Sequence, residues 1–166
     1  MLFRSLGYDP ASDFAGVAVL GTTPLLLVVA QGADMRTLRD LIDRAKAKPG
    51  QVTYASAGVG SNTHFAMEVL RSQAGLEMQH VPYKGIPEAL TDVMTGRVAV
   101  FAAPLGNALS MVKSGKLQAL ATTRGQRSPL LPDVPTVSES GMNYVWETWF
   151  GLLRSEEHTS ELQSQS

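Results

Sequence analysis

The sequence predicts an α/β protein in which helices flank a mostly parallel sheet. From residue 25 to residue 121, strand-like segments alternate with helical segments, which is the pattern of consecutive βαβ units. Apolar residues make up 44% of the 166 residues, enough for a packed core. Units of this kind place helices on both faces of one sheet.

The first 30 residues predict strands before any helix. Residues 1–16 show little local pattern, whereas Ala15–Leu20 and Leu25–Ala30 have the composition of strands. The run Gly21–Pro24 interrupts the apolar stretch, so we expect two strands joined at a bend. The stretch is too short for a membrane span, which takes roughly 20 apolar residues. The opening residues do not have the pattern of a signal peptide.

The next segment predicts an amphipathic helix. Thr37 has the position of an N-cap, and Asp40 follows three residues later as in a capping box. Apolar residues follow with helical spacing at Leu38, Leu41, Ile42 and Ala45. Pro49-Gly50 is expected to end this helix.

Further strand–helix units and a less regular segment complete the chain. The expected strands are Gln51–Ala55, Glu77–Val81, Val98–Phe101 and Leu117–Ala121. The helices between them are expected to end near Gly75, Gly96 and Gly115. The last part is expected to contain a proline-rich loop at Arg124–Val137, a short helical turn at Val137–Ser140 and an aromatic strand at Tyr144–Leu153.

A glycine-rich turn, Ser56–His64, is the strongest candidate for a binding site. It joins a strand to a helix, where free backbone N–H groups and the positive end of a helix dipole coincide. This arrangement suits a small anion, most simply a carboxylate. The same sequence also fits a plain turn in which Ser or Asn only caps the helix. A nucleotide motif is excluded, because Thr63 replaces the third glycine of a dinucleotide fingerprint and Gly60 is followed by Ser61-Asn62 instead of Lys-Ser/Thr.

Two further turns, Tyr83–Gly85 and Ala102–Gly106, also follow strands. Ligands of open α/β sheets bind beyond the carboxyl ends of the strands, so we expect the three turns to meet at one edge. Lys84 there either attracts an anion or is a solvated surface charge. Tyr83 either lines the cleft or packs on the neighbouring turn.

The composition excludes several other functions. The net charge is −1 and no basic block is present, so nucleic acid is not expected as a partner. The chain has no cysteine, hence no disulfide and no thiolate metal site, and its three histidines lack metal-binding spacing. We therefore expect neither a metal nor a cofactor.

Several motifs of this chain occur together in a familiar order. They are Tyr8-Asp9-Pro10 with Asp13-Phe14, Ser56-Ala57-Gly58, Val81-Pro82-Tyr83-Lys84-Gly85, Leu131-Pro132-Asp133-Val134-Pro135-Thr136 and Trp149-Phe150-Gly151-Leu152. The series resembles the Bug family, the TctC-like extracytoplasmic solute receptors of tripartite tricarboxylate transporters. The resemblance covers about residues 3 to 153 and is more specific than any one motif.

The resemblance implies a periplasmic binding protein, type II-like, with two lobes of mostly parallel sheet. Such a receptor is a monomer and not an enzyme. It closes on a small mono-, di- or tricarboxylate and delivers this ligand to the membrane permease subunits of the transporter. Family members are longer than this chain, so the first lobe is expected to be incomplete in this fragment.

The resemblance also implies a division of the chain. The expected parts are 1–28 (end of a first-lobe segment and crossover), 29–120 (complete second lobe), 121–153 (return to the first lobe) and 154–166 (non-native disordered tail). The tail is expected because Arg154–Ser164 looks like the translation of a sequencing adapter. A genuine polar C-terminus is the alternative.

The ligand site that follows from the turns and the resemblance is built mainly of backbone donors. Ser61, Asn62 and Thr63 are expected to hold one carboxylate together with the N–H groups from Gly58 to His64. The full expected set is Ser56, Ala57, Gly58, Gly60, Ser61, Asn62, Thr63, His64, Tyr83, Lys84 and Gly85. His64 itself either points at the cleft or is a capping or packed residue.

Residues outside this set are expected to have structural roles or to tune specificity. Trp146 and Trp149 are expected in the core and in lobe contacts. Thr22 and Thr23, beside the crossover, either contact the ligand or only satisfy the backbone of the hinge. Family members often carry an acidic residue after the strand Val98–Phe101, where this chain has Ala102-Ala103-Pro104. If that acid orients an amine or a water, this protein should prefer a ligand without an amino group.

Two other functional hypotheses remain open from the sequence. One is a hydrolytic or transfer enzyme of the same architecture, with Ser61 and His64 as nucleophile and base. It lacks an evident acid to orient the histidine, and Ser56 lacks the flanking glycines of a nucleophile elbow. The other is that this length of chain has no independent function because half of one lobe is missing.

Overall fold

The structure is a computed structural model, and it describes residues 8–9 and 12–155. The chain divides into two compact units, which are described separately here. The larger unit is Thr23–Thr148, and the smaller unit combines the residues up to Thr22 with those from Trp149 onward.

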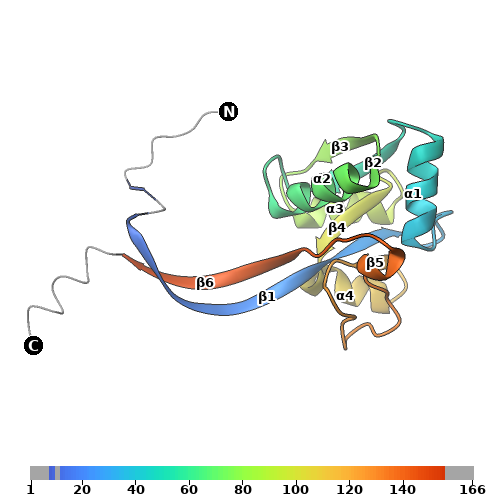
Figure 1. Cartoon of the computed structure of the whole chain (residues 1–166). Helices are drawn as coiled ribbons and strands as arrows, with labels where there is room; N and C mark the ends of the chain where they lie inside the picture. The colour runs from blue at the N-terminus through green and yellow to red at the C-terminus, as the bar shows by residue number, and fades with distance from the viewer. Residues whose placement is uncertain (1–7, 10–11, 156–166) are drawn as a thin grey trace, which may run out of the picture. The chain divides into compact units, whose positions relative to one another are not determined.

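Helices and strands alternate through the larger unit as the sequence predicts (Figure 1). The strands are β1 (Phe14–Ala30), β2 (Val52–Ser56), β3 (Met78–Pro82), β4 (Val100–Pro104), β5 (Leu117–Thr122) and β6 (Glu147–Ser155). The helices are α1 (Leu38–Ala47), α2 (Asn62–Ala74), α3 (Ile86–Met94) and α4 (Leu105–Lys113), with a 3-10 turn, η1, at Ser138–Ser140.

β1 corrects the prediction of two strands joined at a bend. It is one continuous strand of 17 residues that runs through Gly21 and Pro24. Its pairing with β4 and β5 begins at Leu25 and Leu26, so the missing N–H of Pro24 removes no hydrogen bond to these strands. A proline can therefore stand in the strand without breaking it.

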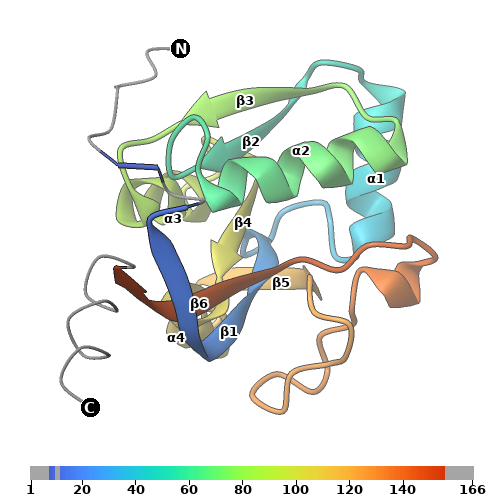
Figure 2. The same cartoon turned by 60° about the vertical axis from the view of Figure 1, so that its left-hand side comes forward.

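The sheet is mixed, with the order β3-β2-β4-β1-β5 and with β6 paired to β1. β2 is parallel to both β3 and β4, whereas β1 is antiparallel to β4 and β5. The α/β class is as predicted. The difference lies in β1, which runs opposite to its neighbours in the middle of the sheet (Figure 2).

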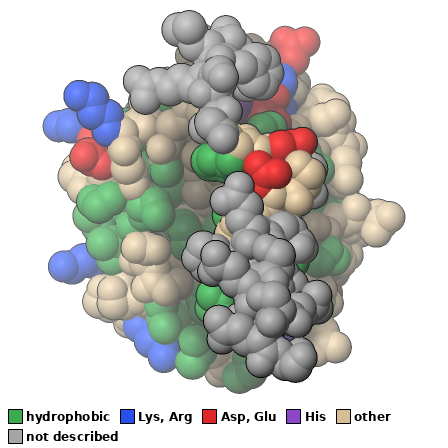
Figure 3. Space-filling view, turned by 90° about the vertical axis from the view of Figure 1, so that its left-hand side faces the viewer, with side chains coloured by type: hydrophobic (Ala, Val, Ile, Leu, Met, Phe, Trp, Pro, Cys, Tyr) green, Lys and Arg blue, Asp and Glu red, His purple; other side chains and the backbone are tan. Residues whose placement is uncertain are grey.

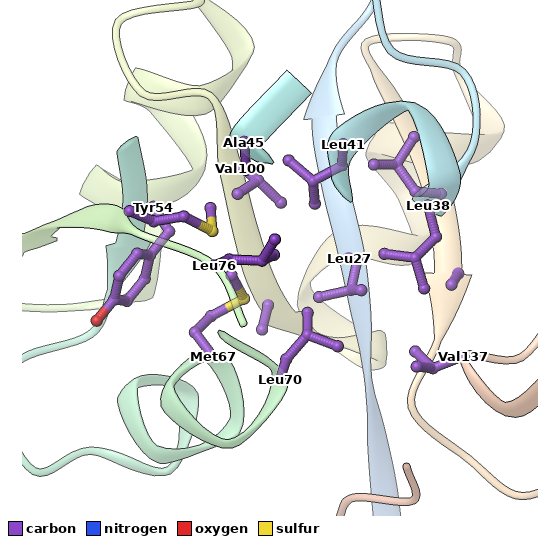
Figure 4. Close-up of a cluster of buried hydrophobic side chains, with 14 of the residues drawn as sticks. Leu27, Leu38, Leu41, Ala45, Tyr54, Met67, Leu70, Leu76, Val100 and Val137 are labelled. Carbon is purple, nitrogen blue, oxygen red and sulfur yellow. The ribbon is translucent and has the colours of Figure 1, made fainter. Parts of the chain in front are cut away.

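Alternate residues of the central strands supply two separate cores. In β1, Leu25, Leu27 and Val29 face α1 and α2, while Leu26 and Val28 face α3 and α4. The first core also contains Leu38, Leu41 and Ala45 of α1 and Met67 and Leu70 of α2, which gather around Leu27 in Figure 4. Helices therefore cover both faces of the sheet.

The smaller unit contains the first part of β1 and most of β6. Its apolar side chains are largely exposed. Figure 3 shows one face of the molecule, on which apolar side chains (green) reach the surface beside polar and charged ones. The exposed ones are Phe14, Val17, Val19, Leu20, Trp149, Phe150, Leu152 and Leu153. Trp149 is 63% exposed and belongs to neither core of the described residues, so its expected role in a lobe contact stays a prediction.

Of the predicted divisions of the chain, the structure bears only on the start of the C-terminal tail. β6 continues through Ser155, two residues into the segment predicted as a non-native tail. The rest of that tail, with residues 1–7 and 10–11, lies outside the described residues. The assignment of 1–28, 29–120 and 121–153 to lobes stays a prediction. No helix of the described part is long and apolar enough to span a bilayer.

Candidate functional site

The turns that follow β2 and β3 meet at one edge of the sheet, as predicted, but the predicted third turn, Ala102–Gly106, is absent, because residues 102–104 lie in β4 and α4 begins directly at Leu105. Ser56 at the end of β2 pairs with Pro82 at the end of β3. Next to them, β4 runs parallel to β2 and ends at Pro104. The first two turns touch directly, because the N–H of Tyr83 donates to the carbonyl of Ser56 at 2.9 Å.

Gly58 lies beside the second turn, next to the carbonyl of Tyr83. Its φ of 127° is a conformation that residues with a side chain rarely adopt. A Cβ at this position would lie 3.4 Å from the carbonyl oxygen of Tyr83. The positive φ explains the glycine in the motif Ser56-Ala57-Gly58, whereas the Cβ distance of 3.4 Å would be an ordinary van der Waals contact.

The hydroxyls of the glycine-rich turn stabilise the turn itself. Ser61 is the N-cap of α2, and its Oγ accepts from the N–H of His64 at 3.3 Å. Thr63 is buried, and its Oγ1 accepts from the N–H of Ala57 at 2.9 Å and lies 3.0 Å from the Oγ of Ser61. These two side chains fix the loop, so they serve the site by shaping it.

Several backbone N–H groups of the turn remain available. Among the described residues, none accepts from the N–H of Val59, Asn62 or Thr63. Asn62 and Thr63 form the first turn of the 13-residue helix α2, where the helix dipole adds positive potential. This is the geometry that binds a carboxylate through main-chain donors.

The Asn62 side chain forms hydrogen bonds with two other side chains of the protein. Its Oδ1 accepts from the indole Nε1 of Trp146 at 2.9 Å, and its Nδ2 donates to the hydroxyl of Thr148. Trp146 in turn packs against the first core. Asn62 therefore links the start of α2 to Trp146 and Thr148, while its backbone N–H has no acceptor among the described residues.

His64 packs beside the loop, one of the alternatives that the sequence left open. Its Nδ1 accepts from the N–H of Gly60 at 3.2 Å. Its ring stacks on that of His80, with centroids 4.0 Å apart. His80, on β3, lies behind the turn, and burial followed by the charge of His64 lowers the pKa of His80 below its ordinary 6.5.

Sequence reasoning missed His80 as a part of the site. Its Nε2 lies 2.6 Å from the Oγ of Ser56, although the two residues are 24 positions apart in the chain. A signal was available, because parallel pairing of β2 with β3 brings position 80 next to position 54. Ser56 itself is fully buried, so its hydroxyl supports the loop from below.

The second turn, Tyr83–Gly85, carries one charged side chain, that of Lys84. The hydroxyl of Tyr83 donates to a carboxylate oxygen of Asp92 at 2.8 Å, and burial with this contact raises the pKa of Tyr83 to about 12. Its side chain thus packs against α3. Lys84 is exposed, and no carboxylate of the described residues pairs with it. Gly85 is the N-cap of α3.

The structure corrects the interpretation of Ala102-Ala103. These residues do not follow the strand but lie inside β4, where they pair with Leu27 and Leu26 of β1. Both are fully buried, one in each core. They cannot face a ligand, so they give no basis for selection against an amino group.

Other hollows and side-chain groups of the larger unit lie away from this edge. A surface hollow of about 390 Å³ lies between residues 30–35 and residues 94–99. It is at the other end of the sheet from these turns, where β1 ends and β4 begins. Within the described part of the chain, no three His, Asp or Glu side chains are grouped to hold a metal ion. The turns of the edge therefore carry the candidate site.

Comparison with known proteins gives the site its context. Residues 1–162 match the family described as the tripartite tricarboxylate transporter family receptor. The chain belongs to this family. Similar curated proteins are Protein BugT of Bordetella pertussis, 33% identical over 92% of this chain and 47% of BugT, and a UPF0065 protein of Pseudomonas sp. strain P51, 33% identical over 88% of this chain and 44% of that protein.

Solved structures of the family share the fold. Rhodopseudomonas palustris Rpa4515 with adipate has a TM-score of 0.83 and 33% identity over 93% of this chain and 52% of that chain. MatC of the same organism, with bound malate, has a TM-score of 0.81 and 28% identity over 93% and 53%. The periplasmic binding protein BugD has a TM-score of 0.80. This receptor chain thus spans about half the length of the relatives that it matches.

Proposed function

We propose that this chain is part of an extracytoplasmic receptor that captures a small carboxylate for a tripartite tricarboxylate transporter. The observation that carries the proposal is the cluster of available N–H groups at Val59, Asn62 and Thr63, at the edge where the turns meet. Membership of the receptor family supports the role, and relatives with adipate and malate support the ligand class. The location would be the periplasm, and the partners the permease subunits.

The proposed site is the loop Ser56–His64 together with the turn Tyr83–Gly85. The first turn of α2 would hold one carboxylate by its N–H groups, in the field of the helix dipole. Exposed Lys84 on the adjoining turn would attract the anion over a longer range. Ser56, Ala57, Gly58, Gly60, Ser61 and Thr63 would shape the loop, with Tyr83 and Gly85 fixing the second turn.

A non-catalytic role agrees better with the geometry than the enzyme hypothesis. The Oγ of Ser61 is bonded to the N–H of His64 and lies against Thr63, whereas the Nδ1 of His64 accepts from Gly60. The two side chains are therefore each engaged with other groups, and His64 does not act as the base for Ser61. We propose that the receptor binds its ligand unchanged.

The test is a titration of the chain with adipate, followed by amide NMR shifts. The amides of Val59, Asn62 and Thr63 should shift in a saturable way, and adipamide, which has the same length but no charge, should cause no shift. Saturable shifts elsewhere, or none at millimolar adipate, would contradict the proposal.

A matched pair of variants separates the backbone from the side chain. Asn62 is the first residue of α2, and Ser61 before it has φ −72° and ψ 160°, so Asn62→Pro fits the backbone and removes only one N–H beyond the side chain. Asn62→Ala removes the side chain and keeps the N–H. We expect the affinity for adipate to fall about fivefold more in Asn62→Pro than in Asn62→Ala, the effect of one hydrogen bond. Equal affinities would overturn the backbone assignment.

A further inference from the structure

A stack of three rings supports the glycine-rich loop. The imidazoles of His64 and His80 are nearly parallel, at 14°, with centroids 4.0 Å apart. The ring of Tyr54 lies nearly parallel to both, with its centroid 5.0 Å from that of His80 and 6.4 Å from that of His64. The rings come from α2, β3 and β2, so three elements meet directly beneath one loop.

Each imidazole is bonded to the loop. The Nδ1 of His64 accepts from the N–H of Gly60 at 3.2 Å, and the Nε2 of His80 lies 2.6 Å from the Oγ of Ser56. The same Oγ accepts from the N–H of Gly58 at 3.2 Å and lies 3.1 Å from its carbonyl oxygen. Both glycines of the loop are thus fixed through an imidazole.

We propose that the neutral His64–His80 stack holds this loop in its binding conformation and releases it when the stack takes up a proton. The inference rests on the proposed function and adds two positioning residues and a pH dependence to it. The bond to Gly60 needs a lone pair on the Nδ1 of His64, and a proton there would leave two N–H groups facing each other. A charge on one ring also repels a charge on the other at this spacing.

The charged and titratable groups that face the stack do not cancel this effect. Tyr54 donates its hydroxyl to Glu68, and Glu68 is paired with Arg71 at 2.6 Å. Because Arg71 neutralises Glu68, the carboxylate gives limited support to an imidazolium. Burial, and next the charge of His64, lowers the pKa of His80, and Glu68 opposes them with a smaller influence. Folded His80 therefore resists protonation, as the pH falls, more than a free imidazole does.

The experiment measures amide hydrogen exchange in the whole chain between pH 8 and pH 5, without ligand. The protection factor of Gly60, which corrects for the intrinsic effect of pH, should fall about fivefold in acid, the effect of losing one hydrogen bond. The control is the amide of Gly75, at the other end of α2, which donates to the carbonyl groups of Arg71 and Ser72. An unchanged Gly60 protection factor, or an equal fall at Gly75, would overturn the proposal.

Variants separate positioning from general stability. His64→Asn keeps an acceptor near the place of Nδ1 but does not titrate, so Gly60 should stay protected and lose its pH dependence. His64→Ala should leave Gly60 less protected at every pH. Gln79→Ala, at an exposed neighbour of His80, should keep the wild-type profile. A wild-type pH profile in His64→Asn would contradict the inference.

Adipate binding gives an independent arm. At each pH, comparing the wild type with His64→Asn cancels the titration of adipate itself. As the pH falls, the affinity of the wild type for adipate should fall about fivefold relative to that of His64→Asn, in parallel with the protection factor of Gly60. Tighter wild-type binding in acid would overturn the proposal, because the imidazolium would then act as an attracting charge. An absence of adipate shifts would contradict the proposed function, while the exchange data decide the positioning role.

Discussion

Gly58 has a backbone conformation in the loop that favours glycine. Replacement by alanine would place a Cβ 3.4 Å from the carbonyl of Tyr83, at a φ of 127°. We expect Gly58→Ala to lower the free energy of unfolding by about 1–3 kcal/mol, the usual cost of such a backbone conformation. Urea unfolding measures the effect.

The matched control is Gly106→Ala at the start of α4. No atom lies within 4 Å of a Cβ built there, and no positive φ is required. This variant should be neutral or more stable by about 0.5–1 kcal/mol, because alanine favours the helix. Equal destabilisation by both substitutions would mean that the conformation of Gly58 is not what constrains the loop.

At the same scale, the site illustrates what a sequence can reveal about individual residues. The glycines, the N-cap at Ser61 and the available N–H groups follow from local pattern, so the loop was found without a structure. The direction of a side chain does not follow from local pattern. Asn62 bonds to Trp146, 84 positions away, and Ser56 to His80, so these partners depend on how distant elements pack.

Among the elements, α1 has the most complete set of end signals. The Oγ1 of Thr37 accepts from the N–H of Asp40 at 3.1 Å, and Asp40 accepts from the N–H groups of Arg36 and Thr37, each at 2.9 Å. The backbone N–H of Arg36 first, and then Thr37, lower the pKa of Asp40 from 3.8. The capping box predicted from the sequence is confirmed.

The lowered pKa gives α1 a pH-dependent contribution to stability. A carboxyl whose pKa is lower when folded stabilises the protein above its unfolded value, here 3.8, and loses this effect as the pH falls through the folded value. Asp40→Asn should therefore be less stable than the wild type at pH 7, and the difference should shrink below pH 4. Thermal unfolding of both chains across this range tests the expectation. A difference that grows in acid would contradict it.

Elements differ in how far the sequence determines them. Each of the four predicted helices is present, because caps and helical spacing are local signals. The strand ends were less predictable. β4 begins two residues later than expected and continues to Pro104, because its limits depend on pairing with β2 and β1. The direction of β1 is likewise set by its partners, and no periodicity within residues 14–30 encodes it.

At the scale of the whole molecule, the strand β1 runs through both units, and its residues are mostly buried in the larger unit and mostly exposed in the smaller one. Within β1, the segment Leu25–Val29 has no exposed area, while Val19 is 69% exposed. Amides of the buried segment should exchange only by global unfolding of the larger unit, and the amide of Val19 by local opening. Hydrogen exchange followed by NMR should thus show high protection at Leu27 and Phe101 and much lower protection at Val19.

A core substitution makes this prediction decisive. Leu27→Ala should lower the free energy of unfolding by about 2–5 kcal/mol, because Leu27 lies fully buried between α1 and α2. The lower free energy of unfolding should also speed exchange at the amide of Phe101. This residue lies in the core on the other face of the sheet but belongs to the same cooperative unit. Exchange at Val19 should not change. The control, Val19→Ala, should leave Leu27 and Phe101 as they are. If Leu27→Ala speeds exchange at Val19 as much as at Phe101, the two units unfold as one, and the division at Thr22–Thr23 has no energetic meaning.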